Sequence, residues 1–137
     1  MEQRQELVRE LTSLMKERKY KKKKQTWYKE GSDLIIIFNV QNSCYGENYY
    51  INLGIIIKKL MKEQGGICLS NCHIQERVNE KDRYGRYLTA QSLMLVLDLW
   101  EQWYGNLSTL RTKAVEGKLP HYSTAEARTF LTTVRLG

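Results

Sequence analysis

The stretch LIIIFNVQNSCYGENYYINLGIII, which spans residues 34–57, decides the fold of this chain. Its two ends are dense in Ile, Val, Phe and Tyr, the residue types that fit the half-buried surface of a β-sheet. Its middle, residues 42–48, is rich in Asn, Ser and Gly, which are typical of a chain reversal. The stretch therefore predicts two antiparallel strands joined as a β-hairpin.

Side-chain alternation gives the two faces of this hairpin different characters. A reversal centred on Tyr45-Gly46 places Phe38 opposite Leu53, because antiparallel partners keep a constant sum of residue numbers. The same register pairs Val40 with Ile51 and Ile36 with Ile55. One face is then wholly apolar, with Leu34, Ile36, Phe38, Val40, Ile51, Leu53, Ile55 and Ile57. The other face is apolar at one end and polar at the other, with Ile35, Ile37, Asn39, Gln41, Tyr50, Asn52, Gly54 and Ile56. A lone hairpin is marginal in water, so we expect helices to pack on it.

Helical periodicity indicates where these helices lie. Leu7, Leu11, Leu14 and Met15 predict an amphipathic helix over residues 3–19. A second helix runs from an N-cap at Thr89 to about Tyr104. Its apolar stripe contains Leu93, Val96, Leu97 and Trp100, and Met94, Leu95 and Leu99 broaden this stripe. We therefore expect the second helix to be nearly buried.

Two shorter helices are expected near the carboxyl end. Residues 108–116 predict one helix, which ends before Gly117 and Pro120. Ser123-Thr124-Ala125-Glu126 is a capping box that predicts a last helix over residues 124–135. Phe130, Leu131 and Val134 would dock this helix on the core.

Two further strands complete the predicted sheet. Residues 25–30 form a strand joined to the hairpin by Gly31-Ser32-Asp33, which puts Tyr28 beside Ile36 on the core face and Trp27 beside Ile37 on the other. Residues 71–78 form a fourth strand in which Cys72 and Ile74 face the core. The prediction is one α+β domain over residues 1–137, with an N-terminal helix, a four-stranded antiparallel meander and two or three C-terminal helices on the sheet.

Four separated pieces of the chain resemble a known family. They are KKKKQTWYK at residues 21–29, NVQ at 39–41, YINLGI at 50–55 and CHIQER at 72–77. In order and spacing they resemble the bacterial family catalogued as domain of unknown function 4304 (DUF4304), over roughly residues 5–100. This chain has Lys24-Gln25 where the family pattern has a glycine after the lysines. The resemblance implies an α+β domain and brings no assigned activity or catalytic residue.

Charge and cysteine content indicate the class of protein. The net charge is +7, but residues 1–30 alone hold ten basic and five acidic residues, so the basicity is a local feature. The three cysteines, an odd number with no preceding secretion signal, favour a reduced cytoplasmic protein. No apolar run approaches the roughly 20 residues of a membrane span, so we expect a soluble protein with no membrane partner.

A basic patch covers residues 16–24 and consists of Lys16, Arg18, Lys19, Lys21, Lys22, Lys23 and Lys24. A structural interpretation is that these side chains are a solvated surface, with the first of them complementing the dipole at the end of the N-terminal helix. A functional interpretation is that they bind the phosphates of a nucleic acid, together with Arg83 and Arg86.

The predicted sheet also gathers polar residues on the face away from the core. They are Asn39, Gln41, Tyr50, Asn52, His73, Gln75 and Arg77. His73 and Arg77 could hold an anion while the amides orient it. Alternatively, the C-terminal helices cover this face and the polar groups satisfy buried backbone atoms.

Metal binding and catalysis find little support in the residues. Cys68, Cys72, His73 and Cys44 offer ligand types for zinc, but adjacent residues of a strand point to opposite faces, so we expect no metal. The chain has no phosphate-binding glycine loop, dinucleotide fingerprint or HExxH helix. We expect no cofactor and lean towards a protein that is not an enzyme.

The sequence thus predicts a non-enzymatic protein-interaction module, of which an immunity-type inhibitor of a toxin is one form. An acidic partner would suit the basic segment. The alternatives are a nucleic-acid-binding protein that uses residues 16–24 and a small-ligand or hydrolytic site on the polar face.

Overall fold

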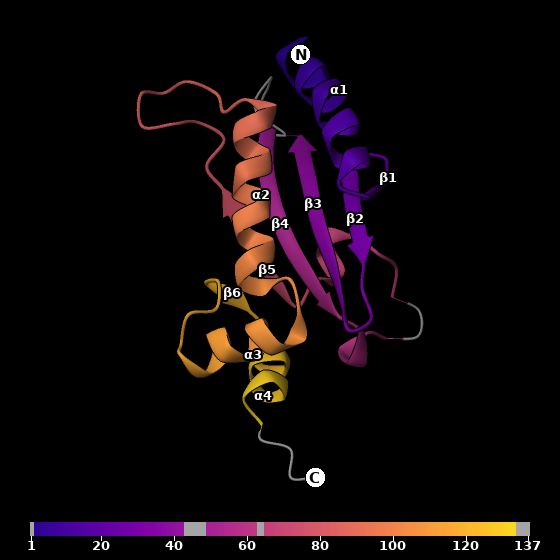
Figure 1. The fold of residues 1–137 in the computed structure, drawn as a ribbon, viewed down its shortest axis with the longest axis vertical. Helices are drawn as coiled ribbons and strands as arrows, with labels where there is room; N and C mark the ends of the chain where they lie inside the picture. Colours follow the sequence, from indigo (N-terminus) through magenta and orange to yellow (C-terminus); the bar gives the residue numbers. More distant parts are fainter. Residues whose placement is uncertain (1, 43–48, 63–64, 134–137) are drawn as a thin grey trace.

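The fold is a six-stranded antiparallel sheet with helices on one face, seen in a computed structural model that describes residues 2–42, 49–62 and 65–133. The strands lie side by side in chain order and are β1 (Lys21–Lys23), β2 (Thr26–Glu30), β3 (Leu34–Asn42), β4 (Tyr49–Ile57), β5 (Ile74–Val78) and β6 (Tyr122–Ser123). The α-helices are α1 (Glu2–Glu17), α2 (Ala90–Tyr104), α3 (Leu107–Val115) and α4 (Ala125–Thr132). Two short 3₁₀ helices, η1 (Lys58–Leu60) and η2 (Leu69–Asn71), lie between β4 and β5. In Figure 1, α1 and α2 run along the sheet, while α3 and α4 lie at its lower end.

The predicted hairpin and its register are confirmed. Strands β3 and β4 pair Phe38 with Leu53, Val40 with Ile51 and Ile36 with Ile55. The reversal predicted at Tyr45-Gly46 lies outside the described residues. All eight members of the predicted apolar face are buried in one core, which α1 and α2 complete with Leu7, Leu11, Met15, Leu93, Leu97 and Trp100.

A second, smaller apolar cluster lies on the opposite face of the sheet. It contains Ile35, Ile37, Ile56 and Cys72, against which Tyr28, Met61, Ile67 and Leu69 pack. The segment between β4 and β5 therefore covers the apolar end of this face, and the helices that the sequence predicts on the sheet lie on the other side.

The sheet has six strands, not the predicted four, because neither edge strand, β1 or β6, shows the alternation of apolar and polar residues that predicts a strand. Strand β1 consists of three exposed lysines, and lysine has a low preference for strands except at sheet edges, where its charge discourages pairing with other chains. Strand β6 has only two residues, too few for an alternation to be recognised.

The predicted register between the first strand and the hairpin is also wrong, by one residue. Trp27 pairs with Phe38 and is fully buried in the main core, whereas Tyr28 pairs with Ile37 on the opposite face. The reason is the length of the connection. Glu30 pairs with Ile35, so the turn contains four residues, 31–34, and the Gly31 N–H closes it by donating to the Leu34 carbonyl.

Cys72 faces the smaller cluster rather than the main core as predicted. Strand β5 begins only at Ile74, so the alternation of a strand does not extend back to Cys72. Its side chain lies over Gly54, the one strand position in β4 that has no side chain of its own.

The caps of the later helices agree in part with the sequence. The Thr89 hydroxyl caps α2 by accepting a hydrogen bond from Ser92 N–H, as predicted. The cap of α4 is Thr124, not Ser123, because Ser123 belongs to β6 and pairs with Ile74. Val134 lies outside the described residues.

Helix α2 is less buried than predicted. The side chains of Leu95 and Leu99 are 70% and 53% exposed, because the sheet, α1 and α3, against which α2 packs, leave these two side chains uncovered. None of the described helices is long and apolar enough to cross a membrane.

Candidate functional site

A row of polar residues crosses five strands on the face away from the helices. The strand pairings align Lys23 with Thr26, Thr26 with Asn39, Asn39 with Asn52, and Asn52 with Arg77. Directly opposite residues share a face of the sheet, so these five side chains lie side by side. We call these five residues the polar row.

Hydrogen bonds connect the polar row from β2 to β5. Asn39 Nδ2 donates to Thr26 Oγ1 at 2.9 Å, and Asn52 Nδ2 donates to Asn39 Oδ1 at 3.1 Å. Arg77 Nε donates to Asn52 Oδ1 at 3.3 Å. The amides are thereby held in fixed orientations, so the surface is organised before any ligand arrives.

Gln41 and Tyr50 extend the row towards the end of the hairpin. Gln41 Oε1 accepts hydrogen bonds from Asn52 Nδ2 at 3.0 Å and from Arg77 Nη2 at 3.5 Å. The Arg77 guanidinium also lies over the Tyr50 ring, 4.2 Å from its centroid. Arg77 is therefore fixed by an aromatic ring and two neutral amide oxygens.

Solvent reaches this part of the sheet. Lys23, Gln41 and Arg77 are exposed, and Asn39 and Tyr50 are half-buried. Asn52 alone is buried, at 5% exposure, because its neighbours in the row surround it. The alternative in which the C-terminal helices cover these residues does not hold, since α1 to α4 pack against the main core.

Two residues predicted for this surface, His73 and Gln75, do not join the polar row. Four residues of extended chain, about 13 Å, separate His73 from Arg77, so they cannot hold one small anion between them. His73 precedes β5, where its Nδ1 accepts the Ile57 N–H at 3.0 Å. Gln75 Nε2 donates to the Leu69 carbonyl at 3.1 Å and so anchors η2. The sequence pattern could not show this, because η1 and η2 have no strand-like alternation.

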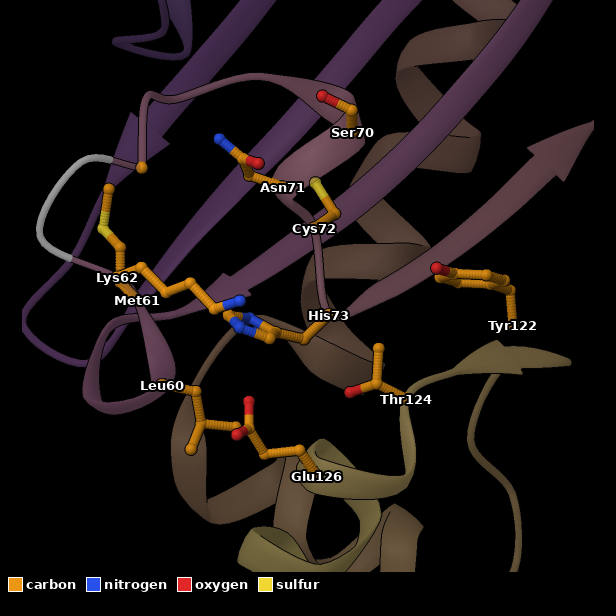
Figure 2. A pocket seen from close by; sticks show the side chains of 11 residues that line it. Leu60, Met61, Lys62, Ser70, Asn71, Cys72, His73, Tyr122, Thr124 and Glu126 are labelled. Atoms are coloured by element: carbon orange, nitrogen blue, oxygen red, sulfur yellow. The ribbon is translucent and has the colours of Figure 1, made fainter.

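His73 lines a separate cleft of about 430 Å³ between the end of β4 and the start of α4. Figure 2 shows its side chains, among which are Lys62, Asn71, Cys72, Thr124 and Glu126. Burial lowers the pKa of His73, and a hydrogen bond with the Leu60 backbone partly opposes this. Since Nδ1 accepts from the Ile57 N–H, the imidazole joins the start of β5 to the end of β4.

The cysteines of the described chain offer no activated nucleophile. Burial raises the pKa of Cys72 to about 12, so its thiol stays protonated at neutral pH. Cys68 is half-buried and its Sγ contacts Ser70 Oγ at 3.2 Å. Cys44 lies outside the described residues. Within residues 2–42, 49–62 and 65–133, no group of three His, Cys, Asp or Glu side chains is placed to hold a metal.

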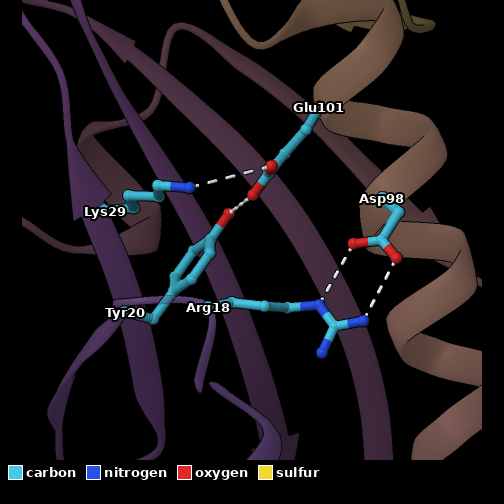
Figure 3. Close-up of polar contacts among 5 residues, drawn as sticks. All are labelled: Arg18, Tyr20, Lys29, Asp98 and Glu101. Atoms are coloured by element: carbon cyan, nitrogen blue, oxygen red, sulfur yellow. Dashed lines mark hydrogen bonds and ion pairs between the residues drawn. The ribbon is translucent and has the colours of Figure 1, made fainter. Parts of the chain in front are cut away.

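The basic patch does not form one surface. Arg18 makes two hydrogen bonds of 3.1 Å to the Asp98 carboxylate and so joins α1 to α2, as Figure 3 shows. Lys19 ends α1 with a left-handed φ of 67°, in a motif where Tyr20 N–H donates to the Met15 carbonyl and Lys19 N–H to that of Lys16. Two of the seven residues of the patch therefore have a structural role.

The three lysines of β1 alternate between the two faces of the sheet. Lys22 pairs with Trp27 and lies over its ring, at 5.5 Å from the centroid, on the side of the helices. Lys21 and Lys23 point to the opposite face, because they pair with Tyr28 and Thr26. No sequence pattern links these two lysines to Arg77, since three successive lysines do not predict a strand.

Comparison with known proteins identifies the family of the chain and nothing more. A family model described as "Domain of unknown function (DUF4304)" matches residues 11–108, which include every member of the polar row. No curated protein and no solved structure matches the chain.

Proposed function

This chain belongs to the DUF4304 family of domains of unknown function, and we propose that it is a non-enzymatic protein-interaction module that binds an acidic partner through the polar row. The observation that carries this proposal is the state of Arg77. Its guanidinium is held in place, yet it has no carboxylate partner among the described residues. Arg18 and Arg86, by contrast, are paired with Asp98 and Asp82.

An arginine fixed by neutral groups is well suited to binding a carboxylate. The amide oxygens of Gln41 and Asn52 orient the guanidinium without neutralising its charge. A carboxylate of a partner could then form two parallel hydrogen bonds at little cost in side-chain entropy. Arginine and tyrosine are also the residues that most often dominate binding energy at interfaces, and Arg77 and Tyr50 are in contact here.

The lysines of β1 support an acidic partner. Lys21 and Lys23 lie on the same face as Arg77, at the other end of a row that is about 19 Å long across five strands. Exposed lysines contribute mainly to the rate of association rather than to final affinity. We therefore assign steering to the lysines and the central contact to Arg77.

Within this class we propose an immunity-type inhibitor of a toxin. Such a protein needs a rigid complementary surface and no catalytic group. The hydrogen-bonded row supplies rigidity, and the protonated thiol of Cys72 and the backbone contacts of His73 are consistent with a protein that acts by binding.

Nucleic-acid binding is the second candidate, because Lys21, Lys23, Arg77 and the Tyr50 ring share one exposed face of the sheet. On such a surface lysines neutralise phosphates and an aromatic ring stacks on bases. This candidate predicts an affinity that falls steeply as the salt concentration rises. Binding to a protein through Arg77 does not require such a steep salt dependence.

The test is affinity capture from the native host with the tagged chain, with and without nuclease and at low and high salt, followed by titration of the purified partner. We expect to capture a protein that stays bound after nuclease treatment and at high salt. The purified partner should bind the tagged chain with one-to-one stoichiometry. Arg77→Ala should weaken binding by about 30-fold or more, as expected for an interface hot spot. Arg9→Ala is the matched control, because Arg9 is an exposed arginine on α1, and should change binding less than twofold.

Two outcomes would overturn the proposal. Capture of nucleic acid alone, lost on nuclease treatment, would favour the second candidate. A captured protein that binds Arg77→Ala as tightly as the original chain would show that the polar row is not the interface.

A further inference from the structure

Helix α2 carries an exposed apolar stripe on the side away from α1. Leu95, Leu99 and Trp103 recur at intervals of four residues, so they lie on one side of the helix. Their side chains are 70%, 53% and 40% exposed. Isolated exposed leucines need no explanation, but three large apolar side chains in one row are typical of an interaction surface.

A groove of about 200 Å³ lies between this stripe and the sheet. Its lining residues are Leu53, Glu76, Val96, Leu99, Trp100, Trp103 and Tyr104. One wall is the edge of the sheet, because β6 pairs with Ile74 and Gln75 and no described strand pairs with residues 76–78 on that side. No described strand therefore covers the edge of the sheet beside Glu76.

Glu76 gives this groove an unusual charge. Its side chain shares the helix-covered face of the sheet, because it pairs with Leu53. Among the described residues it has no ion pair, and its partial burial beside apolar groups raises the pKa of its carboxyl. The residue is nonetheless exposed, so its carboxylate remains accessible to the positive charge of a partner at the edge of the groove.

We propose that this groove is a second interaction site, which binds an apolar segment of another protein that carries a lysine or arginine. The apolar side chains of that segment would pack on Leu99 and on the part of Trp103 that the Lys113 ammonium, 4.1 Å from the centroid of its ring, leaves exposed. Its cation would pair with Glu76, which lines the same groove. This site is independent of the polar row, which lies on the opposite face of the sheet.

The charge of the whole chain makes this proposal specific. A net charge of +7 attracts acidic peptides in general, so unspecific binding would favour an acidic segment. A preference for a basic segment therefore has to come from a local group, and Glu76 is the acidic residue that lines the groove.

The test uses two synthetic helical peptides of about 18 residues, or five turns, with the same leucine stripe and either lysine or glutamate elsewhere. Tryptophan fluorescence reports occupancy, because Trp103 is exposed whereas Trp27 and Trp100 are buried, and calorimetry gives the affinity. We expect saturable binding of the leucine-lysine peptide, at least tenfold tighter than that of the leucine-glutamate peptide. Glu76→Gln should weaken it about two- to fivefold, since it removes the charge of an exposed residue and keeps the shape.

Variants locate the site and separate it from the polar row. Leu99→Asp should abolish binding of the leucine-lysine peptide, whereas Val115→Asp, at an apolar side chain on α3 that is 72% exposed, should leave it unchanged. Arg77→Ala should also leave it unchanged, so a failure of this site and a failure of the polar row are distinguishable.

Three results would overturn the proposal. Equal affinity for the two peptides would show that Glu76 does not select a basic segment. Unaltered binding of the leucine-lysine peptide by Glu76→Gln would show the same. Sedimentation that showed a dimer of the original chain, lost in Leu99→Asp, would mean that a second copy of the chain occupies the groove.

Discussion

The Sγ atom of Cys72 lies so close to the backbone of Gly54 that a Cβ at position 54 would come within 2.5 Å of it. Gly54 is in the middle of β4, where a glycine normally weakens a strand. Here it lets the segment between β4 and β5 pack directly on the sheet and cover the smaller apolar cluster.

Gly54→Ala should therefore destabilise the protein by about 1–3 kcal/mol, the usual cost of overpacking a core. Urea unfolding measures this loss. Gly66→Ala is the control, because a Cβ there meets nothing within 4 Å, and it should have almost no effect. Adding Cys72→Ala to Gly54→Ala should recover part of the loss. No recovery would mean that the thiol is not the obstacle.

Lys24→Gly should stabilise the protein. Lys24 forms the turn between β1 and β2 with a left-handed φ of 58°. That conformation costs a non-glycine residue about 1–2 kcal/mol, of which the greater freedom of glycine in the unfolded chain offsets about 0.4–1. We expect a gain of about 0.5–1 kcal/mol in urea unfolding. Lys23→Gly, inside the strand, should instead destabilise.

The sequence predicted the hairpin well because its two apolar stretches alternate strictly and can bury one face in only one register. The same logic paired Asn39 with Asn52 and put Arg77 on their face. Thr26 was missed as their neighbour, since the register of β2 depends on the turn at residues 31–34, whose length the sequence did not determine.

The parts of the site that could not be predicted depend on contacts between distant segments. In the sequence, Arg18 is one of several cations in a basic run. Its partner Asp98 is 80 residues away, so the sequence pattern does not show their ion pair. Likewise, Leu95 and Leu99 read as core residues because periodicity shows that a helix has an apolar side, not whether another element covers it.

Tyr20→Phe should cost about 1.5–3 kcal/mol in urea unfolding, as expected for a hydrogen bond to a charged group. The buried Tyr20 hydroxyl donates to the Glu101 carboxylate and ties the end of α1 to α2. Burial, followed by this hydrogen bond, raises the pKa of Tyr20. Tyr84→Phe, at a ring that is 66% exposed, is the control and should be neutral.

Arg18→Gln tests the neighbouring ion pair, and it should cost less than Tyr20→Phe. The Arg18 and Asp98 side chains are 29% and 49% exposed, so solvent screens their attraction, and such pairs contribute about 0–1 kcal/mol. A larger loss for Arg18→Gln than for Tyr20→Phe would contradict this ranking.

Stability should fall on acidification through His73. Burial lowers the pKa of His73 below its ordinary value of 6.5, so the unfolded chain binds the proton more readily than the folded one. The contribution of neutral His73 is complete above pH 6.5 and is lost as the pH falls from there towards the lower pKa of the folded state. Protonation also removes the Nδ1 acceptor of the Ile57 N–H.

His73→Asn should flatten this dependence, because its side-chain oxygen can accept the Ile57 N–H and does not titrate in this range. The measurement is the free energy of unfolding at several pH values between about 7 and 5. His121→Asn, which changes the exposed histidine, should keep the dependence. An unchanged slope in His73→Asn would assign it to other groups.

Stability measurements on Asn52 and Arg77 can separate the support of the polar row from its binding group. Asn52 is buried and bonds to Asn39, Gln41 and Arg77, so Asn52→Ala leaves polar groups unpaired and should cost about 1–3 kcal/mol. Arg77 is exposed and bonds only to neutral oxygens, so Arg77→Ala should cost less than about 1 kcal/mol. A residue that contributes little to folding but strongly to association is one whose role lies in binding. If Arg77→Ala were the more destabilising of the two in urea unfolding, the guanidinium would instead be a structural clamp on the sheet.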